Sequence, residues 1–470
     1  MKYPLLLSLF CLPVLCRAQA FSNFNMQDAT IAFELAHVET PDGVWVAAVY
    51  RFVIGEGDRV SILRSLDQGV TWLEDTVYAD VVDPAMCLDN NGDILLVLQH
   101  VTFGGSTLEL HRSSDNGDHF TYFSALPADG FGDKPWLACD GEGHVYATWT
   151  SILFGSNTIG FTRSDDNGIS WTETSYFVNA TDPILTGSFL CIGNDDTIYM
   201  SWGESITGNI YFSRSTDFGV NWTEPVVVAE MPTKDFSPMT YMFASPAGNH
   251  LIILASIAHQ NKELLYISSA DNGASWTTTL LDTTAVNPAG IMQHNNAIHV
   301  VYTHFPGNYD TGFYSEMRYI SRTPDTDFSA PIILQEGLAD LLYSTYIGEY
   351  AQADIGSDTE LHISWVRKTA DIGFTHSIID IPADTTLHED TTTTATFDLE
   401  GQEWQLSPNP IRDQFHISPY VPNTPIFLYA SDGRLVRSVS SVDGFFSVAD
   451  LPKGMMFIVY QEKAHTCIVQ

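Results

Sequence analysis

The sequence predicts an all-β protein with a β-propeller as its main body, and three observations support this. An eight-residue motif recurs five times at spacings of 48 to 54 residues. Short runs of alternating apolar and polar residues surround each copy, as they do in strands. Hydrophobic residues make up 44% of the 470-residue chain, enough for a packed core. Four short strands per unit of about 50 residues are typical of propeller blades.

The first 20 residues read as a signal peptide. Lys2 precedes an apolar run at residues 5–15, and Ala18-Gln19-Ala20 is a small-residue cleavage site. Leu15 stands before Cys16 where lipoprotein processing needs a small residue, so we expect no lipidation. No later segment is apolar and long enough for a transmembrane helix. We therefore expect an exported chain without a membrane span.

The recurring motif has the form Ser-x-Asp-x-Gly-x-x-aromatic. Its serine and aspartate can accept hydrogen bonds from nearby backbone N–H groups, and its glycine permits a positive φ. The closing aromatic residue supplies an apolar anchor. We expect each copy to fold a turn and fix it to its sheet. The five copies are SLDQGVTW at 65–72, SSDNGDHF at 113–120, SDDNGISW at 164–171, STDFGVNW at 215–222 and SADNGASW at 269–276.

Seven strand-like runs, rather than five, give the number of blades. They begin near Val44, Ile94, Val145, Ile198, Leu251, Ile298 and Leu361. A decayed motif at 321–331 belongs to the sixth unit, and the seventh unit has none. We predict a propeller over residues 21–384 with seven blades, six being the alternative, and a strand near Phe21–Thr30 that completes the last blade.

Charge and cysteine content narrow the functional classes. The net charge is −37, which excludes a nucleic-acid surface built on clustered basic residues. Cys87, Cys139 and Cys191 are each 52 residues apart, which suggests one repeat position in three successive units with buried free thiols. The chain has no CxxC pair and no HExxH motif. We therefore expect no metal site and no cofactor.

The five motifs match the Asp-box (BNR) repeat, so residues 21–384 resemble the sialidase superfamily. The resemblance implies an Asp-box between the third and fourth strands of a blade, and an active site at the opposite end of the channel. A sialidase would also need three arginines that bind the substrate carboxylate, a tyrosine nucleophile polarised by a glutamate, and an aspartate that acts as the general acid/base. No Arg-Ile-Pro motif is present, and Arg64, Arg112, Arg163, Arg214 and Arg322 adjoin motif serines, which assigns them to the framework.

Two sets of site residues follow. The weak catalytic candidates are Arg51, Arg318, Arg367, Asp133, Glu349 and Tyr350. Candidate ligand-binding residues come from the ends of the second strands, where the residue type differs between units, and from the links between blades. They are Tyr50, His100, Ser151, Glu204, His304, Arg367, Asp133 and Trp136. The alternative is that these positions are ordinary exposed loop ends.

The C-terminal part reads as a separate module. Residues 21–404 carry 52 acidic and 13 basic residues, whereas residues 405–470 carry five of each. SPNP at 407–410 and FSVADLPKGMMFIVY at 446–460 resemble the C-terminal sorting domain of the type IX secretion system of Bacteroidetes. We expect a small β-sandwich at 404–470, an immunoglobulin-like accessory module being the alternative. The Thr-rich acidic segment 385–403 reads as a linker.

The function predicted from sequence is binding of a glycan or protein ligand at the channel mouth without turnover. The alternatives are an exo-acting glycosidase of sialidase type with a diverged site, and a structural or adhesive role. The resemblances imply a monomer that crosses the periplasm, loses its signal peptide and reaches the medium or the outer cell surface. Its expected partners are a glycan or glycoprotein and the type IX secretion machinery.

Overall fold

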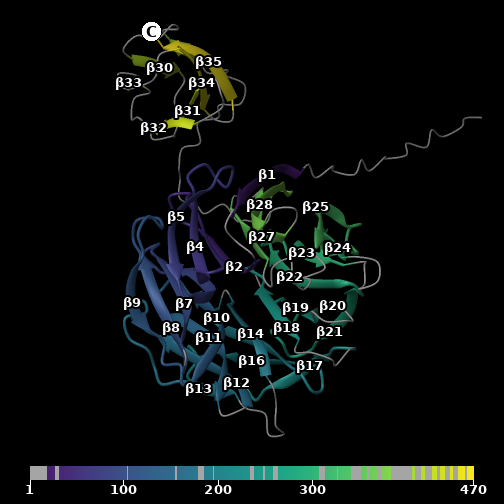
Figure 1. The fold of residues 1–470 in the computed structure, drawn as a ribbon. Helices are drawn as coiled ribbons and strands as arrows, with labels where there is room; N and C mark the ends of the chain where they lie inside the picture. Colours follow the sequence, from purple (N-terminus) through teal and green to yellow (C-terminus); the bar gives the residue numbers. More distant parts are fainter. Residues whose placement is uncertain are drawn as a thin grey trace, which may run out of the picture. The chain divides into compact units, whose positions relative to one another are not determined.

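Seven four-stranded antiparallel sheets form a closed ring in the computed structural model of the protein (Figure 1). No described segment forms a helix that could cross a membrane. The chain divides into one unit at residues 1–388 and a second at 389–470. The described residues are 18–26, 31–102, 104–153, 156–177, 185–193, 195–232, 238–246, 249–257, 263–305, 313–324, 326–339, 351–356, 360–368, 372–382, 405–407, 414–418, 426–430, 435–439, 445–447, 454–460 and 463–469.

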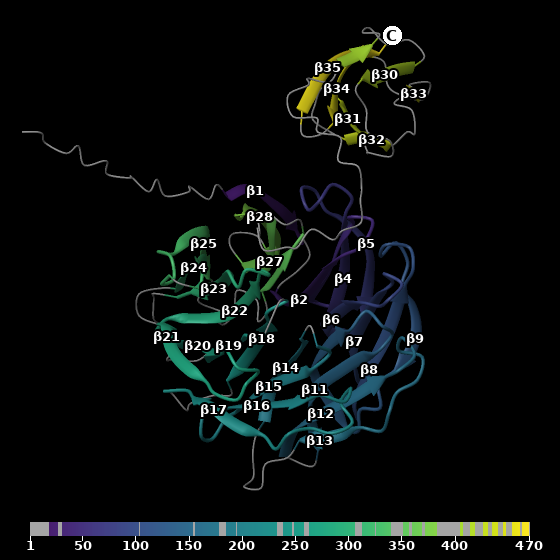
Figure 2. The same ribbon diagram turned by 180° about the vertical axis from the view of Figure 1, so that it is seen from behind.

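The blades follow one another in sequence order, each with its first strand innermost (Figures 1 and 2). The first six are β2(Ile31–Glu39) β3(Trp45–Val53) β4(Gly57–Ser65) β5(Leu73–Ala79); β6(Val81–Leu88) β7(Ile94–Thr102) β8(Gly105–Ser113) β9(Thr121–Ala125); β10(Phe131–Cys139) β11(Val145–Leu153) β12(Ser156–Ser164) β13(Ser175–Phe177); β14(Leu185–Ile192) β15(Ile198–Glu204) β16(Asn209–Ser215) β17(Val226–Glu230); β18(Met239–Ala244) β19(Leu251–Ile257) β20(Glu263–Ser269) β21(Thr277–Asp282); and β22(Ala285–Met292) β23(Ile298–His304) β24(Phe313–Arg322) β25(Ile332–Ala339). All seven strand-like runs seen in the sequence form the second strand of a blade, so the prediction of seven blades is confirmed.

The N-terminal strand closes the ring. Blade 7 contains β26(Gln352–Ile355), β27(Glu360–Lys368) and β28(Ile372–Asp380), and β1(Ala18–Asn25) pairs with β28 as its fourth strand. This confirms the predicted closing strand, which begins at Ala18 rather than Phe21. Residues 1–17, most of the predicted signal peptide, lie outside the described residues.

The five Asp-box turns share one set of hydrogen bonds. The serine Oγ accepts the glycine N–H at 2.7–2.9 Å and donates to the aspartate at 2.7–2.9 Å. The aspartate also accepts the backbone N–H four residues later. The residue before each glycine has a φ of 56–58° and the glycine a φ of 79–85°. Each turn joins the third and fourth strands, as the resemblance implies.

The turns bind neighbouring blades together as well as folding locally. A Cβ on the box glycine would lie 2.5–2.8 Å from a side chain of the preceding blade, so only glycine fits. Three of the framework arginines bind the next box turn: Arg64 contacts Asp118, Arg163 the Phe218 carbonyl and Arg214 the Asn272 carbonyl. These contacts place Arg64, Arg163 and Arg214 in the framework between blades, as predicted.

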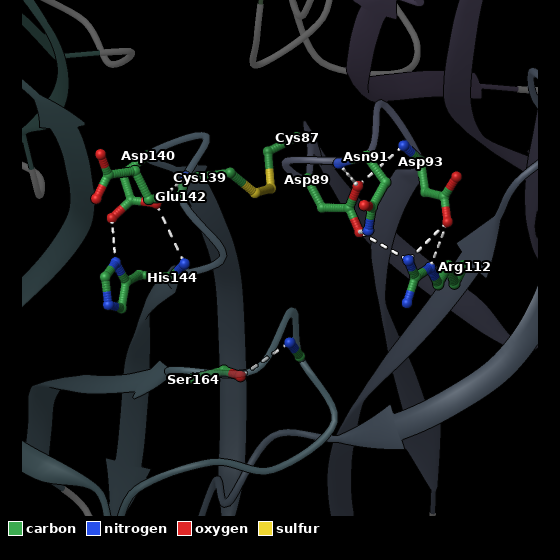
Figure 3. The surroundings of a disulfide bond; sticks show 11 residues. Cys87, Asp89, Asn91, Asp93, Arg112, Cys139, Asp140, Glu142, His144 and Ser164 are labelled. Carbon is green, nitrogen blue, oxygen red and sulfur yellow. Dashed lines mark hydrogen bonds and ion pairs between the residues drawn. A yellow bond between two sulfur atoms is a disulfide. The ribbon is translucent and has the colours of Figure 1, made fainter.

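The cysteine prediction is wrong for Cys87 and Cys139, whereas Cys191 is a free thiol as expected and is partly buried. Cys87 and Cys139 form a disulfide between the innermost strands of blades 2 and 3 (Figure 3). In blade 2, Cys87 pairs with Leu95, the second residue of β7, and Leu88 pairs with the first residue, Ile94. In blade 3, Cys139 pairs with Val145, the first residue of β11, so it occupies the position that Leu88 has in blade 2. Cys139 therefore stands one residue later than Cys87 in its repeat. Its side chain consequently points to the opposite sheet face, toward Cys87.

Aspartate-capped turns follow both cysteines of the disulfide (Figure 3). Asp89 accepts the N–H groups of Asn91 and Asp93 at 2.8 and 3.0 Å, and its other oxygen binds Arg112 at 2.8 Å. Asp140 accepts the N–H of His144 at 3.1 Å in the same way. The disulfide thus joins two rigid hairpins between first and second strands.

The described part of the second unit contains two antiparallel sheets. One contains β29(Gln405–Ser407), β30(Gln414–Ser418) and β33(Phe445–Ser447). The other contains β31(Ile426–Ala430), β32(Leu435–Val439), β34(Gly454–Tyr460) and β35(Lys463–Val469). Packing of these sheets as a sandwich stays a prediction. The predicted linker at 385–403 lies outside the described residues.

Candidate functional site

The channel along the ring axis has two unlike ends. The Asp-box turns and the hairpins between first and second strands lie at one end, which we call the box end. Strand direction alternates within a blade, so the second-to-third hairpins and the links between blades lie at the other end, which we call the mouth. The candidate residues predicted from sequence were chosen for the mouth.

A β-bulge marks the mouth end of the innermost strand in five blades. In each, two residues face one residue of the second strand, and the first bulged residue of four has a φ of 47–64°. Three of those four are not glycine, so the backbone there is strained. A bulge turns side chains out of the pleat, which makes these residues candidates for the channel wall. The bulged pairs are Phe33-Glu34, Asp83-Pro84, Lys134-Pro135, Gly187-Ser188 and Asn287-Pro288.

Three charged side chains from these bulges meet at the mouth. The Lys134 ammonium lies 3.5 Å from Glu34 Oε1 and 3.8 Å from Asp83 Oδ1, and its backbone N–H donates to Asp83 Oδ2 at 3.3 Å. Glu34 and Lys134 belong to blades 1 and 3, so their contact passes across the inner edge of blade 2. Both carboxylates are buried, whereas 21% of the Lys134 side chain is exposed. We call Glu34, Asp83 and Lys134 the mouth cluster.

Tyr50 lies beside this cluster. Its hydroxyl donates to Asp58 at 2.7 Å. Burial raises the pKa of Tyr50, and the hydrogen bond to Asp58 and the charges of Asp58, Glu34 and Asp83 raise it further. Tyr50 therefore remains a protonated hydrogen-bond donor throughout the physiological pH range.

Strand register corrects the placement of Tyr50. His100, Ser151, Glu204 and His304 share one position at the end of the second strand, opposite Val81, Gly132, Leu185 and Ala285. In blade 1 that position is Phe52, opposite Ile31. Tyr50 stands two residues earlier, facing the bulge, where other blades have Leu98, Trp149, Trp202 and Tyr302. The sequence comparison missed this for two reasons: it counted blade 1 from Val44, one residue before the position of Ile94 in blade 2, and blade 1 has one more residue before the bulge.

The four residues that share the predicted position contact their own hairpins or the adjacent blade. His100 Nδ1 lies 3.0 Å from Glu109, and His304 Nδ1 lies 2.9 Å from Asp282. Glu204 accepts the N–H of Ile206 at 2.9 Å, and Ser151 is buried. Glu109, Asp282 and Ile206 lie outside the mouth cluster, so these contacts do not join the four residues into one site.

Trp136 belongs to an aromatic row across the channel wall. It packs on Phe189 at a ring distance of 3.7 Å, and Phe189 packs on Tyr241 at 4.4 Å. Trp136 and Phe189 occupy the first position after the bulge in blades 3 and 4, and Tyr241 has the equivalent pairing position in blade 5, whose first strand has no bulge. The Tyr241 hydroxyl hydrogen-bonds the backbone of Ala353 in blade 7. The row therefore links the innermost strands of blades 3, 4 and 5.

The two arginine candidates with described side chains, Arg51 and Arg318, bind acidic residues in different blades. Arg51 is buried with its guanidinium 3.3 Å from Glu74 on the outermost strand of its blade. Arg318 binds Glu316 at 2.6 Å in blade 6. The backbone of Arg367 pairs with Gly373, and its side chain lies outside the description, as do Glu349 and Tyr350. Asp133 directly precedes the bulged Lys134 and is half-buried at the mouth.

The box end holds a cavity of about 440 Å³ on the channel axis. The ends of the innermost strands of blades 4 to 7 form its wall, mostly with apolar side chains that include Phe243, Met292 and the free thiol Cys191. Burial raises the pKa of Cys191, so this thiol stays protonated. Among the described residues, one group of possible metal ligands is exposed Asp115, Asp118 and His119, and there Asp115 and His119 already bind each other at 2.9 Å.

Comparisons with known proteins agree with the propeller fold. A family model described as a BNR repeat-like domain matches residues 55–337. A protein of unknown function from Dyadobacter fermentans DSM 18053 is 13% identical, with a TM-score of 0.51 over 78% of this chain and 99% of that one. An ulvan polysaccharide lyase is 13% identical, with a TM-score of 0.50 over 76% and 96%.

A more distant similarity is to the NanB sialidase from Streptococcus pneumoniae. It is 12% identical, with a TM-score of 0.42 over 76% of this chain and 69% of that one. No curated protein sequence matches the chain. At these identities, the first two similarities show a shared fold alone.

Proposed function

Because this chain belongs to the BNR repeat-like domain family, we propose that it binds a glycan or glycoprotein ligand at the channel mouth without turning it over. The observation that carries this proposal is the mouth cluster. It brings one ammonium and two carboxylates from three blades to one place. Charged donors and acceptors form the stronger hydrogen bonds that fix a polar ligand.

The composition of the mouth favours a neutral ligand over an anionic one. Glu34, Asp83 and Asp58 stand near Lys134 and the Tyr50 hydroxyl. Carboxylates accept hydrogen bonds from sugar hydroxyl groups but repel carboxylate or sulfate groups. The net charge of −37 acts in the same direction over longer distances.

The distribution of arginines favours binding over catalysis of the sialidase type. That reaction needs three guanidinium groups on one carboxylate, and Arg51 and Arg318 are bound to acidic residues in different blades. Exo-glycosidase activity with a diverged site is the alternative. It predicts substrate turnover that depends on Arg367.

We further propose that the protein acts outside the cell as a monomer. The predicted signal peptide at 1–20 and the resemblance of residues 404–470 to a type IX sorting domain support export through the periplasm to the medium or the cell surface. Cell fractionation with and without residues 404–470 tests this. Retention of the full chain in the periplasm would contradict it.

Two assays on the full mature chain test the functional proposal. A glycan array followed by calorimetry is expected to find neutral saccharide ligands that release no product over hours. A set of fluorogenic glycosides is expected to give no rate above the blank. Turnover that Arg367→Ala abolishes would replace the binding proposal with the glycosidase alternative. Absence of any ligand among glycans and glycoproteins would overturn both.

A further inference from the structure

Three buried histidines form a hydrogen-bonded chain where blade 7 meets blade 1. His37 Nδ1 lies 2.8 Å from the Ser364 hydroxyl, and that hydroxyl lies 2.9 Å from His376 Nδ1. His376 Nε2 lies 3.0 Å from His362 Nδ1. The three rings and Ser364 are at most 6% exposed. They come from β2, β27 and β28, so the chain crosses the contact between the last and first blades.

The number of protons on the three histidines limits the positive charge that their hydrogen bonds can accommodate. A neutral histidine has one N–H, so the contact between His362 and His376 has one donor and one acceptor. If both rings were cationic, with a proton on each of their nitrogens, two N–H groups would face each other across 3.0 Å. The chain can thus keep its hydrogen bonds with one added proton, but a second proton on this pair breaks its central contact.

The groups packed on these histidine rings are uncharged. Trp45 stacks on His362 with a ring distance of 4.2 Å, and Trp72 lies 5.2 Å from His376. Box glycine Gly69 packs directly on His376. Burial, then the neighbouring His362, lowers the pKa of His37 to about 3, and burial lowers that of His362 to about 4.

Three carboxyl groups face the three histidines from the box end of the channel. Glu360 on β27 lies 3.8 Å from His362 Nε2 and is partly exposed. Burial raises the pKa of Asp354 on β26 to about 6. Burial, with the charges of Asp354 and Glu360, raises that of Glu39 on β2. Asp354 and Glu39 thus gain protons in the closed ring before they would in an open one.

We propose that His37, Ser364, His376 and His362 form an acid-sensitive latch that opens the ring between blades 7 and 1. In the open state the histidines have a pKa near 6.5 and bind protons that the closed seam excludes. The free energy that favours the closed ring is therefore complete above pH 6.5 and decreases as the pH falls toward 4. Asp354 and Glu39 act in the opposite direction and cancel up to two of the three protons. The opening constant is therefore expected to rise at least tenfold per pH unit between pH 6 and 4.

Hydrogen exchange of the full mature chain, corrected for intrinsic rates, tests the latch between pH 7.5 and 4. Peptides from β2 and β27 are expected to lose protection in this range, while β6 and β10, joined by the disulfide, keep it. Equal protection of both pairs of strands down to pH 4 in the wild-type protein would overturn the proposal, whatever the variants do.

Two variants separate the latch from general acid sensitivity. His362→Phe keeps a ring on Trp45 but removes one titrating group. The rise of the opening constant per pH unit is therefore expected to be about tenfold smaller than in the wild type. His299→Phe is the matched control, because His299 is also buried and hydrogen-bonded, but to Tyr319 in blade 6. A seam that opens in His362→Phe as steeply as in wild type, or that flattens equally in His299→Phe, would contradict the latch.

Discussion

The box end and the mouth of the same channel follow opposite rules. At the box end, five turns repeat the same hydrogen bonds with the same residue types and distances that differ by about 0.2 Å. At the mouth, the equivalent bulge positions carry phenylalanine, aspartate, lysine, glycine and asparagine. A repeated scaffold tolerates such divergence only where packing does not require one residue type. The difference indicates that packing fixes the residue types at the box end and leaves them free to vary at the mouth, where we propose the ligand site.

The largest expected effect comes from the disulfide at the box end. Replacing Cys87 and Cys139 with alanine frees a loop of 52 residues in the unfolded chain. The chain-entropy relation gives a loss of about 4 kcal/mol in the free energy of unfolding. Denaturant unfolding measures it, and ligand affinity at the mouth is expected to stay unchanged. A tenfold loss of affinity would contradict the separation of the two ends.

The next effect is at a box glycine. In Gly273→Ala, the new Cβ would lie 2.5 Å from the Phe212 ring at a φ of +82°, so we expect a loss of about 3 kcal/mol. Gly43→Ala is the control, because Gly43 has a φ of +76° with nothing within 4 Å of a Cβ. Its loss is expected to be about 1 kcal/mol. Equal melting temperatures for the two variants would show that the contact with blade 4 contributes nothing.

The fold of the protein was predicted from the sequence more completely than its candidate site. The motif spacing and the seven strand runs predicted the blades, the box turns and the closing strand, because repeats of one packing unit conserve their periodicity. Tyr50 was misplaced by two residues, because the count in its blade began one residue early at Val44 and because that blade has one additional residue before the bulge, which spacing alone does not reveal. The disulfide was missed because one residue of displacement turns Cys139 to the other sheet face. Glu34 was missed because its bulge lacks the proline that marks Asp83 and Lys134.

The smallest effect is the titration of a box aspartate. Hydrogen bonds from the Ser275 side chain and backbone, and from Ser269, lower the pKa of Asp271 to about 2. Its stabilising contribution is complete above about pH 4, the unfolded value, and is lost as pH falls through 2. Carboxyl NMR shifts of Asp271 are expected to titrate near 2, and Ser275→Ala to move the midpoint upward. A midpoint near 4 in the wild type would show that the box turn does not favour the charged form.

The most direct test of the functional account compares one cation at each end of the channel. Lys134→Gln removes the ammonium of the mouth cluster, and Arg163→Gln removes a guanidinium that binds the Phe218 carbonyl at the box end. With the saccharide found on the array, calorimetry is expected to show at least a tenfold loss of affinity for Lys134→Gln, because hydrogen bonds to charged groups contribute about 1.5–3 kcal/mol. Arg163→Gln is expected to bind as the wild type does. Unchanged affinity in a folded Lys134→Gln variant, or an equal loss in both, would contradict ligand binding at the mouth.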